Sequence, residues 1–273
     1  DGLLIARGGS PTVSGALTTA VGSTIRVLGD GTFSSATLTV ANGFANNGTI
    51  DLTSVAGAQP ATLVVTTGAL VNAPTTGVIT TLAGTGGTRT INALLDNQGT
   101  ITIDQSLTMT TGAAALTNSG TITLAGGDFT LTQSGAGSFT NSGTVDIQTG
   151  RIWTINNGTL AYTGGAISGA GTLNLSSVTF NLTPNFTNAT TALGLTNSTV
   201  NGPGTLTNAA TKTLTLTNSN IAAPFANDGL LIARGGSPTV SGALTTAVGS
   251  TIRVLGDGTF SSATLTVANG FAN

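Results

Sequence analysis

The sequence contains no cysteine, no histidine and no glutamate, and its one lysine is Lys212. Without cysteine, no disulfide can hold the fold, and without histidine or cysteine the usual pairs of catalytic base and nucleophile are missing. The seven basic residues are scattered, so no basic patch is available to neutralise a phosphate backbone. We therefore expect a non-enzymatic protein with no cofactor, no metal site and no nucleic-acid partner.

Long hydrophobic runs are missing as well. No apolar stretch approaches the ~18 residues that a membrane helix requires, which predicts no membrane insertion in this segment. The opening residues, DGLLIARGG, lack the layout of a signal peptide. We accordingly expect the mature natural protein to begin elsewhere than at Asp1.

Charged residues make up 6% of the chain and hydrophobic residues 39%, with a formal net charge of −2. Disordered chains usually combine low hydrophobicity with high net charge, so this composition argues for an ordered protein. Threonine, a strand former, accounts for roughly a fifth of the residues, while the helix formers glutamate, lysine and arginine are scarce. The composition predicts an all-β fold.

One motif recurs along the chain: an apolar residue, any residue, Asn, any residue, Gly, Thr, and then an alternating apolar pattern. It reads FTNSGTVDI at 139–147, LTNSGTITL at 116–124, LDNQGTITI at 95–103 and FANNGTIDL at 44–52, and a looser copy, FANDGLLI, begins at 225. Asn and Gly favour a sharp turn, and the alternation that follows is the period of a half-buried strand. The motif predicts a structural corner that feeds a strand, with corner residues Asn46, Asn97, Asn118, Asn141, Asn227, Gly48, Gly99, Gly120, Gly143 and Gly229.

Successive corners are separated by about 20 to 26 residues, which is the length of one coil of a parallel β-solenoid. Each coil would then pair with the next at a strand spacing of ~4.8 Å. Equivalent residues should stack in columns, with an amide ladder through Asn97, Asn118 and Asn141. In the coil at 116–138, the side chains predicted to point inward are those of Ile122, Leu124, Phe129 and Leu131.

The largest internal feature is a duplication, because residues 1–46 recur without a change as residues 228–273. Residues 1–227 are therefore interpreted as one full tandem repeat of a continuous solenoid, and residues 228–273 as the start of the next. The spacing of the apolar corner residues from Phe44 to Phe271 divides this repeat into about ten coils. We expect either a much longer natural protein or separate chains that meet end to end.

The corners and the runs GAGTL, GPGTL and SGTITL resemble the β-strand repeats of autotransporter passengers, filamentous haemagglutinin-like proteins and other giant bacterial surface proteins. The resemblance extends over nearly the whole chain. It implies a right-handed parallel β-helix, an extracellular or cell-surface location, and a role as a stalk, fibre or adhesin. Those proteins usually diverge from coil to coil, whereas the copied 227-residue unit of this chain favours a fibre-forming array.

β-Solenoids also include polysaccharide-degrading enzymes, which need paired carboxylates. Asp51 and Asp146 share one outward position, but they should lie about four coils, or roughly 19 Å, apart. We therefore interpret the carboxylates as solvated surface charges. The runs most similar to calcium-binding repeats are LGDGTF (28–33, copied at 255–260) and AGGDFTL (125–131), but neither recurs every nine residues. We therefore expect Asp30 and Asp128 to support turns.

Two other surface features could bind a ligand. Thr-x-Thr pairs such as Thr100 and Thr102 can order water on a flat solenoid face, although Asp51 and Asp146 should interrupt that column. The single tryptophan, Trp153, together with Arg151, could contact a sugar or a partner if its ring were exposed.

The leading hypothesis is a structural extracellular fibre or adhesin stalk built from identical solenoid repeats. Its partner would be another copy of itself, through end-to-end continuation and through lateral bundling of sides that carry few charges. The alternative is a face that binds surface glycans or a receptor, for which loss of binding in Trp153→Ala would be the discriminating result. Ice binding and polysaccharide degradation are less favoured.

Overall fold

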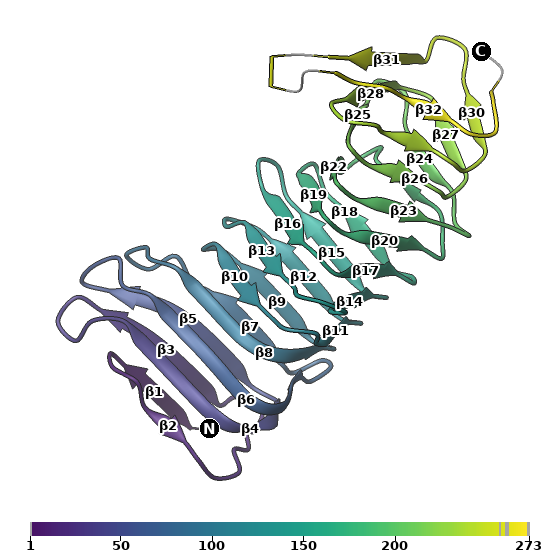
Figure 1. The fold of residues 1–273 in the computed structure, drawn as a ribbon. Coiled ribbons are helices and arrows are strands. Elements are labelled where there is room, and N and C mark those ends of the chain that lie inside the picture. The colour runs from purple at the N-terminus through teal and green to yellow at the C-terminus, as the bar shows by residue number, and fades with distance from the viewer. Residues whose placement is uncertain (1, 257, 260–261, 272–273) are drawn as a thin grey trace.

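In the computed structural model, the chain forms an elongated stack of coils built from β-strands (Figure 1). The structure describes residues 2–256, 258–259 and 262–271. These residues form parallel strands stacked as a β-solenoid of about 12 turns, which confirms the all-β solenoid prediction. The described part of the chain contains no helix that is long and apolar enough to cross a membrane.

Each coil passes through three strand positions, which we call faces A, B and C in chain order. Face A is a parallel sheet of eight strands. Its strands are β1 (Leu3–Arg7), β3 (Thr24–Asp30), β5 (Thr49–Val55), β7 (Val78–Thr81), β9 (Thr100–Ile103), β12 (Thr121–Leu124), β15 (Thr144–Ile147) and β18 (Ala166–Ser168).

In the early coils, one long strand bends from face B to face C, and in later coils the two faces have separate strands. Face B contains β2 (Thr12–Val13), the first halves of β4 (Ala36–Asn46), β6 (Ala61–Asn72) and β8 (Arg89–Asn97), β10 (Leu107–Thr110), β13 (Phe129–Thr132), β16 (Ile152–Asn156), β19 (Thr172–Ser176), β22 (Ala192–Thr196), β25 (Thr213–Thr217), β28 (Leu230–Arg234) and β31 (Thr251–Leu255). Face C contains the second halves of β4, β6 and β8, β11 (Ala115–Asn118), β14 (Ser138–Asn141), β17 (Thr159–Tyr162), β20 (Thr179–Leu182), β23 (Thr199–Asn201), β26 (Asn220–Ile221), β29 (Thr239–Val240) and β32 (Thr266–Val267).

Beyond β18, a separate four-stranded sheet takes the place of face A in the chain order. Each of its strands follows a face C strand and precedes a face B strand, so every coil keeps three strand positions. The strands are β21 (Phe186–Thr187), β24 (Leu206–Asn208), β27 (Phe225–Asn227) and β30 (Leu244–Thr246).

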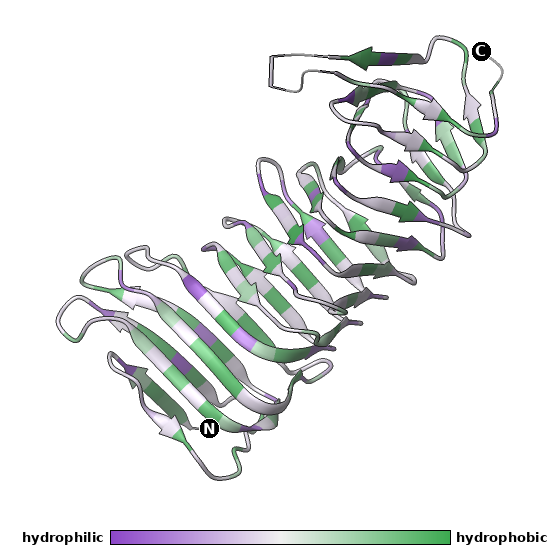
Figure 2. Ribbon diagram, viewed as in Figure 1, coloured by the Kyte–Doolittle hydropathy of each residue, from purple (hydrophilic) through white to green (hydrophobic). Residues whose placement is uncertain are grey.

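The interior is filled by alternate residues of each strand, and Figure 2 shows this alternation of hydropathy along the ribbon. Four side chains of the coil at 116–138 point inward as predicted and are at most 1% exposed: Ile122, Leu124, Phe129 and Leu131. The threonines between them are half-buried at the surface. Equivalent residues stack on one another, as Ile101, Ile122 and Val145 do on face A. Parallel pairing thus joins each coil to the next through evenly spaced backbone hydrogen bonds.

The two copies of the duplicated segment fall on different faces. Strand β1 lies on face A just before β2, whereas its copy β28 lies on face B, ten pairings after β2. Their internal pairings are nevertheless the same, since Leu3 pairs with Thr24 and Leu230 with Thr251. The 227-residue unit therefore spans ten coils plus one face. The prediction of about ten coils is confirmed, and the second copy begins on a different face from the first.

The register between residues 150 and 225 also departs from a single column of apolar corner residues. On face C, Phe139 is followed by Leu160, then Phe180, then Val200. Phe186 and Phe225 belong instead to the four-stranded sheet. The motif identifies a corner, but it does not distinguish among the three corners of a coil.

Candidate functional site

Five asparagines form a buried column at the corner between face C and face A. Each side-chain amide donates from Nδ2 to the Oδ1 of the asparagine one coil later, at 2.7–2.9 Å, and the last donates to the carbonyl oxygen of Gly143. A buried unpaired amide would cost about 1–3 kcal/mol, whereas a completed bond contributes only about 1 kcal/mol. The ladder therefore fixes the register of the coils more than it stabilises them. Its members are Asn46, Asn72, Asn97, Asn118 and Asn141, none more than 1% exposed.

Asn72 is part of this ladder although it does not match the motif. The sequence VNAPTTG places four residues between Asn72 and Gly77, where the motif has one. The structure keeps the asparagine in the column and turns the extra residues back, with the Gly77 N–H donating to the Ala73 carbonyl oxygen. The apolar residue two positions before the asparagine, Leu70, is the sequence signal that remains.

Asn227, grouped with these corner residues by its motif, lies in a second ladder. Asn188 donates to Asn208 at 2.8 Å, and Asn208 donates to Asn227 at 2.7 Å. This ladder lies after the four-stranded sheet and before face B, so it occupies a different corner of the coil. Asn188 and Asn208 escape the motif because no glycine follows them at the required position.

The corner glycines serve close packing between coils rather than an unusual backbone conformation. Gly48, Gly99, Gly120, Gly143 and Gly229 all have φ outside the left-handed region. A Cβ at Gly120 would overlap the carbonyl oxygen of Gly99 one coil earlier, and a Cβ at Gly143 would overlap that of Gly120. Any larger residue would therefore push neighbouring coils apart at this corner.

Trp153 is not available for binding. Its side chain is 0% exposed, stacks on Phe129 with ring centroids 5.9 Å apart, and meets Phe139 edge-on at 5.4 Å. The expectation of an exposed tryptophan beside Arg151 is wrong, because strand alternation turns Trp153 inward and leaves Ile152 outside. The half-buried Arg151 instead donates to the carbonyl oxygen of Gly126 at 2.8 Å. The two residues do not form one surface site.

Two carboxylates are buried and paired rather than solvated. Asp51 is 6% exposed and accepts a hydrogen bond from Arg26 Nη2, at 2.9 Å, on the neighbouring strand. Asp30 is 0% exposed and accepts from the Thr32 backbone N–H at 2.8 Å and from Arg7 Nε at 2.6 Å. The interpretation of the carboxylates as solvated is wrong for these two. The Thr32 N–H above all, and then Arg7, hold the pKa of Asp30 below its ordinary value.

Asp51 and Asp146 lie in one outward column of face A, four coils apart as predicted, with a threonine in each intervening coil. This separation is too large for paired carboxylate chemistry. Among the described residues, no group of three or more His, Cys, Asp or Glu could hold a metal ion. Asp30 supports its own turn as expected, and Asp128 accepts from the Ile152 N–H of the next coil at 2.9 Å. Asp1 and Asp257 lie outside the described residues.

Arg89 is the largest polar feature that the motifs did not reveal. Its guanidinium is fully buried at the start of β8 and donates to the carbonyl oxygens of Leu82, Ala83, Gly86 and Gly87 at 2.9–3.2 Å. Burial lowers its pKa. These bonds fasten the loop between β7 and β8 against the core. The run RTI at 89–91 alternates like the other strands, and Arg89 takes a position at which the alternation points the side chain inward. An arginine where an apolar residue is expected was the signal in the sequence.

Face B carries a regular column of threonines, one per coil. The column runs through six coils and is followed by Asn174. On face A, Asp51 and Asp146 interrupt the corresponding column, as predicted. The six residues on face B are Thr37, Thr62, Thr90, Thr108, Thr130 and Thr154.

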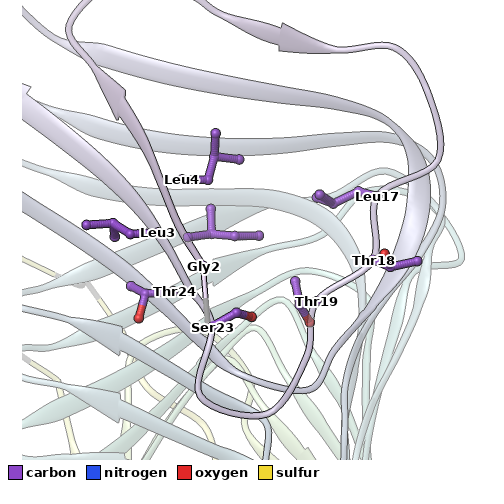
Figure 3. Close-up of a pocket in the computed structure, with 9 residues that line it drawn as sticks. Gly2, Leu3, Leu4, Leu17, Thr18, Thr19, Ser23 and Thr24 are labelled. Carbon is purple, nitrogen blue, oxygen red and sulfur yellow. The ribbon is translucent and has the colours of Figure 1, made fainter.

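The first coil ends in an open apolar hollow, shown in Figure 3. Leu3, Leu4 and Leu17 line it, and Leu3 and Leu4 are 58% and 39% exposed. The opposite end of the stack is also apolar, with Val254 and Phe271 51% and 44% exposed. Both ends therefore present unpaired strand edges next to apolar side chains.

Comparison with known proteins found no matching family model, no matching curated protein and no matching solved structure.

Proposed function

We propose that this chain is a segment of an extracellular structural rod, a fibre or an adhesin stalk, in which copies of the 227-residue unit follow one another along a single solenoid axis. The observation that carries the proposal is the placement of the second copy. The described strands of the second copy repeat pairings of the first copy: Leu230 pairs with Thr251 as Leu3 does with Thr24, and Thr239 pairs with Thr266 as Thr12 does with Thr39. They do so while continuing the preceding coils without a break.

The mechanism is mechanical. Backbone hydrogen bonds between coils run along the axis, the asparagine ladders fix the register at two corners, and apolar columns fill the interior. A repeat protein of this kind gains length with each unit and keeps its cross-section. The surface location is supported by the resemblance of the corner and strand runs to those of giant bacterial surface proteins.

The length of an extended chain tests this proposal. A second copy of residues 47–273 appended in frame adds ten coils plus one face, which corresponds to roughly 50 Å at ~4.8 Å per coil. Small-angle scattering and electron microscopy should show that increase in length at an unchanged cross-section. A wider particle, or two separate bodies, would contradict a continuous rod.

The threonine column on face B favours one second candidate, a face that orders water and binds ice. Its hydroxyl and methyl groups repeat at the coil spacing over six coils. Thermal hysteresis of the unchanged chain, and its loss in Thr108→Leu with Thr130→Leu, would support this candidate. Absence of hysteresis in the unchanged chain would remove it.

A further inference from the structure

The strand equivalent to β1 is covered in the second copy of the duplicated segment. Strands β1 and β28 have the same sequence, LLIAR, but β28 pairs on both sides, whereas within the described residues β1 pairs with β3 alone. On its additional side, β28 rests on β25, with Leu214 opposite Leu231 and Leu216 opposite Ala233. Leu231 is 0% exposed as a result, and its copy Leu4 is 39% exposed.

One side of the hollow in Figure 3 is covered in the second copy. The counterpart of Leu17 is Leu244, which pairs with Phe225 of β27 and is 7% exposed. Ala226 and Asn227 pair with the next two residues, which are the copies of Thr18 and Thr19. The side of the hollow formed by Leu17, Thr18 and Thr19 therefore corresponds to the strand that β27 covers in the second copy.

We call strands β25, β26 and β27 the seat, and the second copy of the duplicated segment, residues 228–273, the tail, whose strands β28, β29 and β30 pair with the seat. The tail and the first 46 residues are the same sequence, so both fit the seat in the same register. Two chains cannot simply meet end to end in this register, because each seat already carries a tail. One of the two identical segments must leave before the other can bind.

We propose that the seat of one chain accepts residues 1–46 of a second copy of this chain in place of its own tail, so that chains join by exchange of identical segments. This inference rests on the proposed rod and adds a contact between separate chains that uses the same pairing as the two copies within one chain. Each exchange adds one 227-residue unit to the axis and shifts the sequence by one face. The expected strand register is that of the tail, with Leu4 opposite Leu214, Ile5 opposite Thr215 and Ala6 opposite Leu216.

The test releases the tail within the full-length chain. Leu231→Asp with Val240→Asp places two carboxylates at positions that are 0% exposed in the tail and leaves the first copy unchanged. Hydrogen exchange should show loss of protection in the tail and retention in residues 90–200. Light scattering should then show at least a doubling of mass that increases with concentration, whereas the unchanged chain stays monomeric. The further change Leu4→Asp on the released chain should return it to a monomer.

A cross-link tests the register. The chain has no cysteine, so Thr215→Cys in the released chain and Ile5→Cys in a second chain provide one pair of thiols, at a strand spacing that a disulfide can bridge. A disulfide-linked dimer is expected from this pair and not from Thr215→Cys with Val13→Cys. Thr215→Cys with Ile232→Cys, in a chain with an undisturbed tail, is the matched control and should close within one chain.

Three results would overturn the exchange. The first is a released chain that remains monomeric, and the second is a tail that keeps its protection from hydrogen exchange despite two buried carboxylates. The third is a disulfide-linked dimer that forms equally well with Val13→Cys as with Ile5→Cys. A rod of the expected length that fails to exchange would refute this inference alone, because the length measurement on the extended chain tests the stalk separately.

Discussion

The duplicated sequence lies in two settings, with strands β1 to β4 in the first copy and β28 to β32 in the second. Leu4 of β1 is 39% exposed, while its copy Leu231 of β28 is 0% exposed. In the next strand the contrast reverses, since Val27 of β3 is 0% exposed and its copy Val254 of β31 is 51% exposed. The difference follows from neighbours, because β3 and β28 pair on both sides whereas β1 and β31 pair on one. Local sequence decides which side chains face inward, and the adjacent coils complete their burial.

The two copies also differ in the face that they occupy. The first begins on face A and the second on face B, yet both form the same internal pairings. This sequence therefore forms the same pairings from two of the three faces. In an array of such units, any outward side chain would move by one face per unit and would return to its starting face after three units.

The largest expected effect comes from placing a charge at matched positions of the two copies. Val27→Asp buries a carboxylate with no cation beside it, and it should lower the free energy of unfolding by about 3–5 kcal/mol. Val254→Asp makes the same change at an exposed edge, and it should alter that free energy by no more than about 0.5 kcal/mol. Denaturant unfolding of both variants checks the contrast. Equal losses would show that the edge strand β31 is covered in solution.

An intermediate effect is expected along the asparagine ladder, where interior and end members differ in the same way. Asn118→Ala leaves the amide of Asn97 with only a 3.4 Å bond to the Thr121 carbonyl oxygen, and it leaves the Oδ1 of Asn141 without its ladder donor, which should cost about 1–3 kcal/mol. Asn46→Ala at the first position removes the donor to the Asn72 Oδ1 and to the Val78 carbonyl oxygen, and the acceptor of the Gly48 N–H. It leaves every other amide of the ladder with its acceptor, so its cost should be smaller. Thermal unfolding measures both, and a larger loss in Asn46→Ala would contradict a ladder that acts through shared bonds.

The strand and corner pattern of the first half could be predicted from sequence because each coil repeats a short rule. Alternation placed Ile122 and Phe129 inward, and the spacing of the motif placed Thr100, Thr121 and Thr144 in one column. These features depend on residues close in sequence and on one repeating distance.

The features that could not be predicted depend on which corner of the coil a motif occupies and on which residues of the neighbouring coil it contacts. The motif at Asn227 reads like the one at Asn46, but it lies at another corner because coils after residue 150 are shorter and carry the strand pattern onto a new face. Trp153 followed the alternation of its strand, and an aromatic partner one coil away, Phe129, completed its burial. The alternation of RTI indicates that Arg89 points inward, but its partners could not be predicted because they are backbone carbonyls, which any sequence provides.

The smallest expected effect concerns the turn of the first copy that Asp30 holds. Its pKa in the folded chain is lowered, chiefly by the Thr32 N–H and then by Arg7. A lowered pKa means that the carboxylate stabilises the fold above its unfolded-state pKa of about 3.9 and loses this contribution as the pH falls through the folded-state value. Asp30→Asn should therefore increase hydrogen exchange in the turn at neutral pH, and the difference from the unchanged chain should shrink in acid. Arg7→Gln keeps the hydrogen bond from the Thr32 N–H and should show the weaker effect. If the difference in exchange between Asp30→Asn and the unchanged chain grew on acidification, the Asp30 carboxylate would not be what holds the turn.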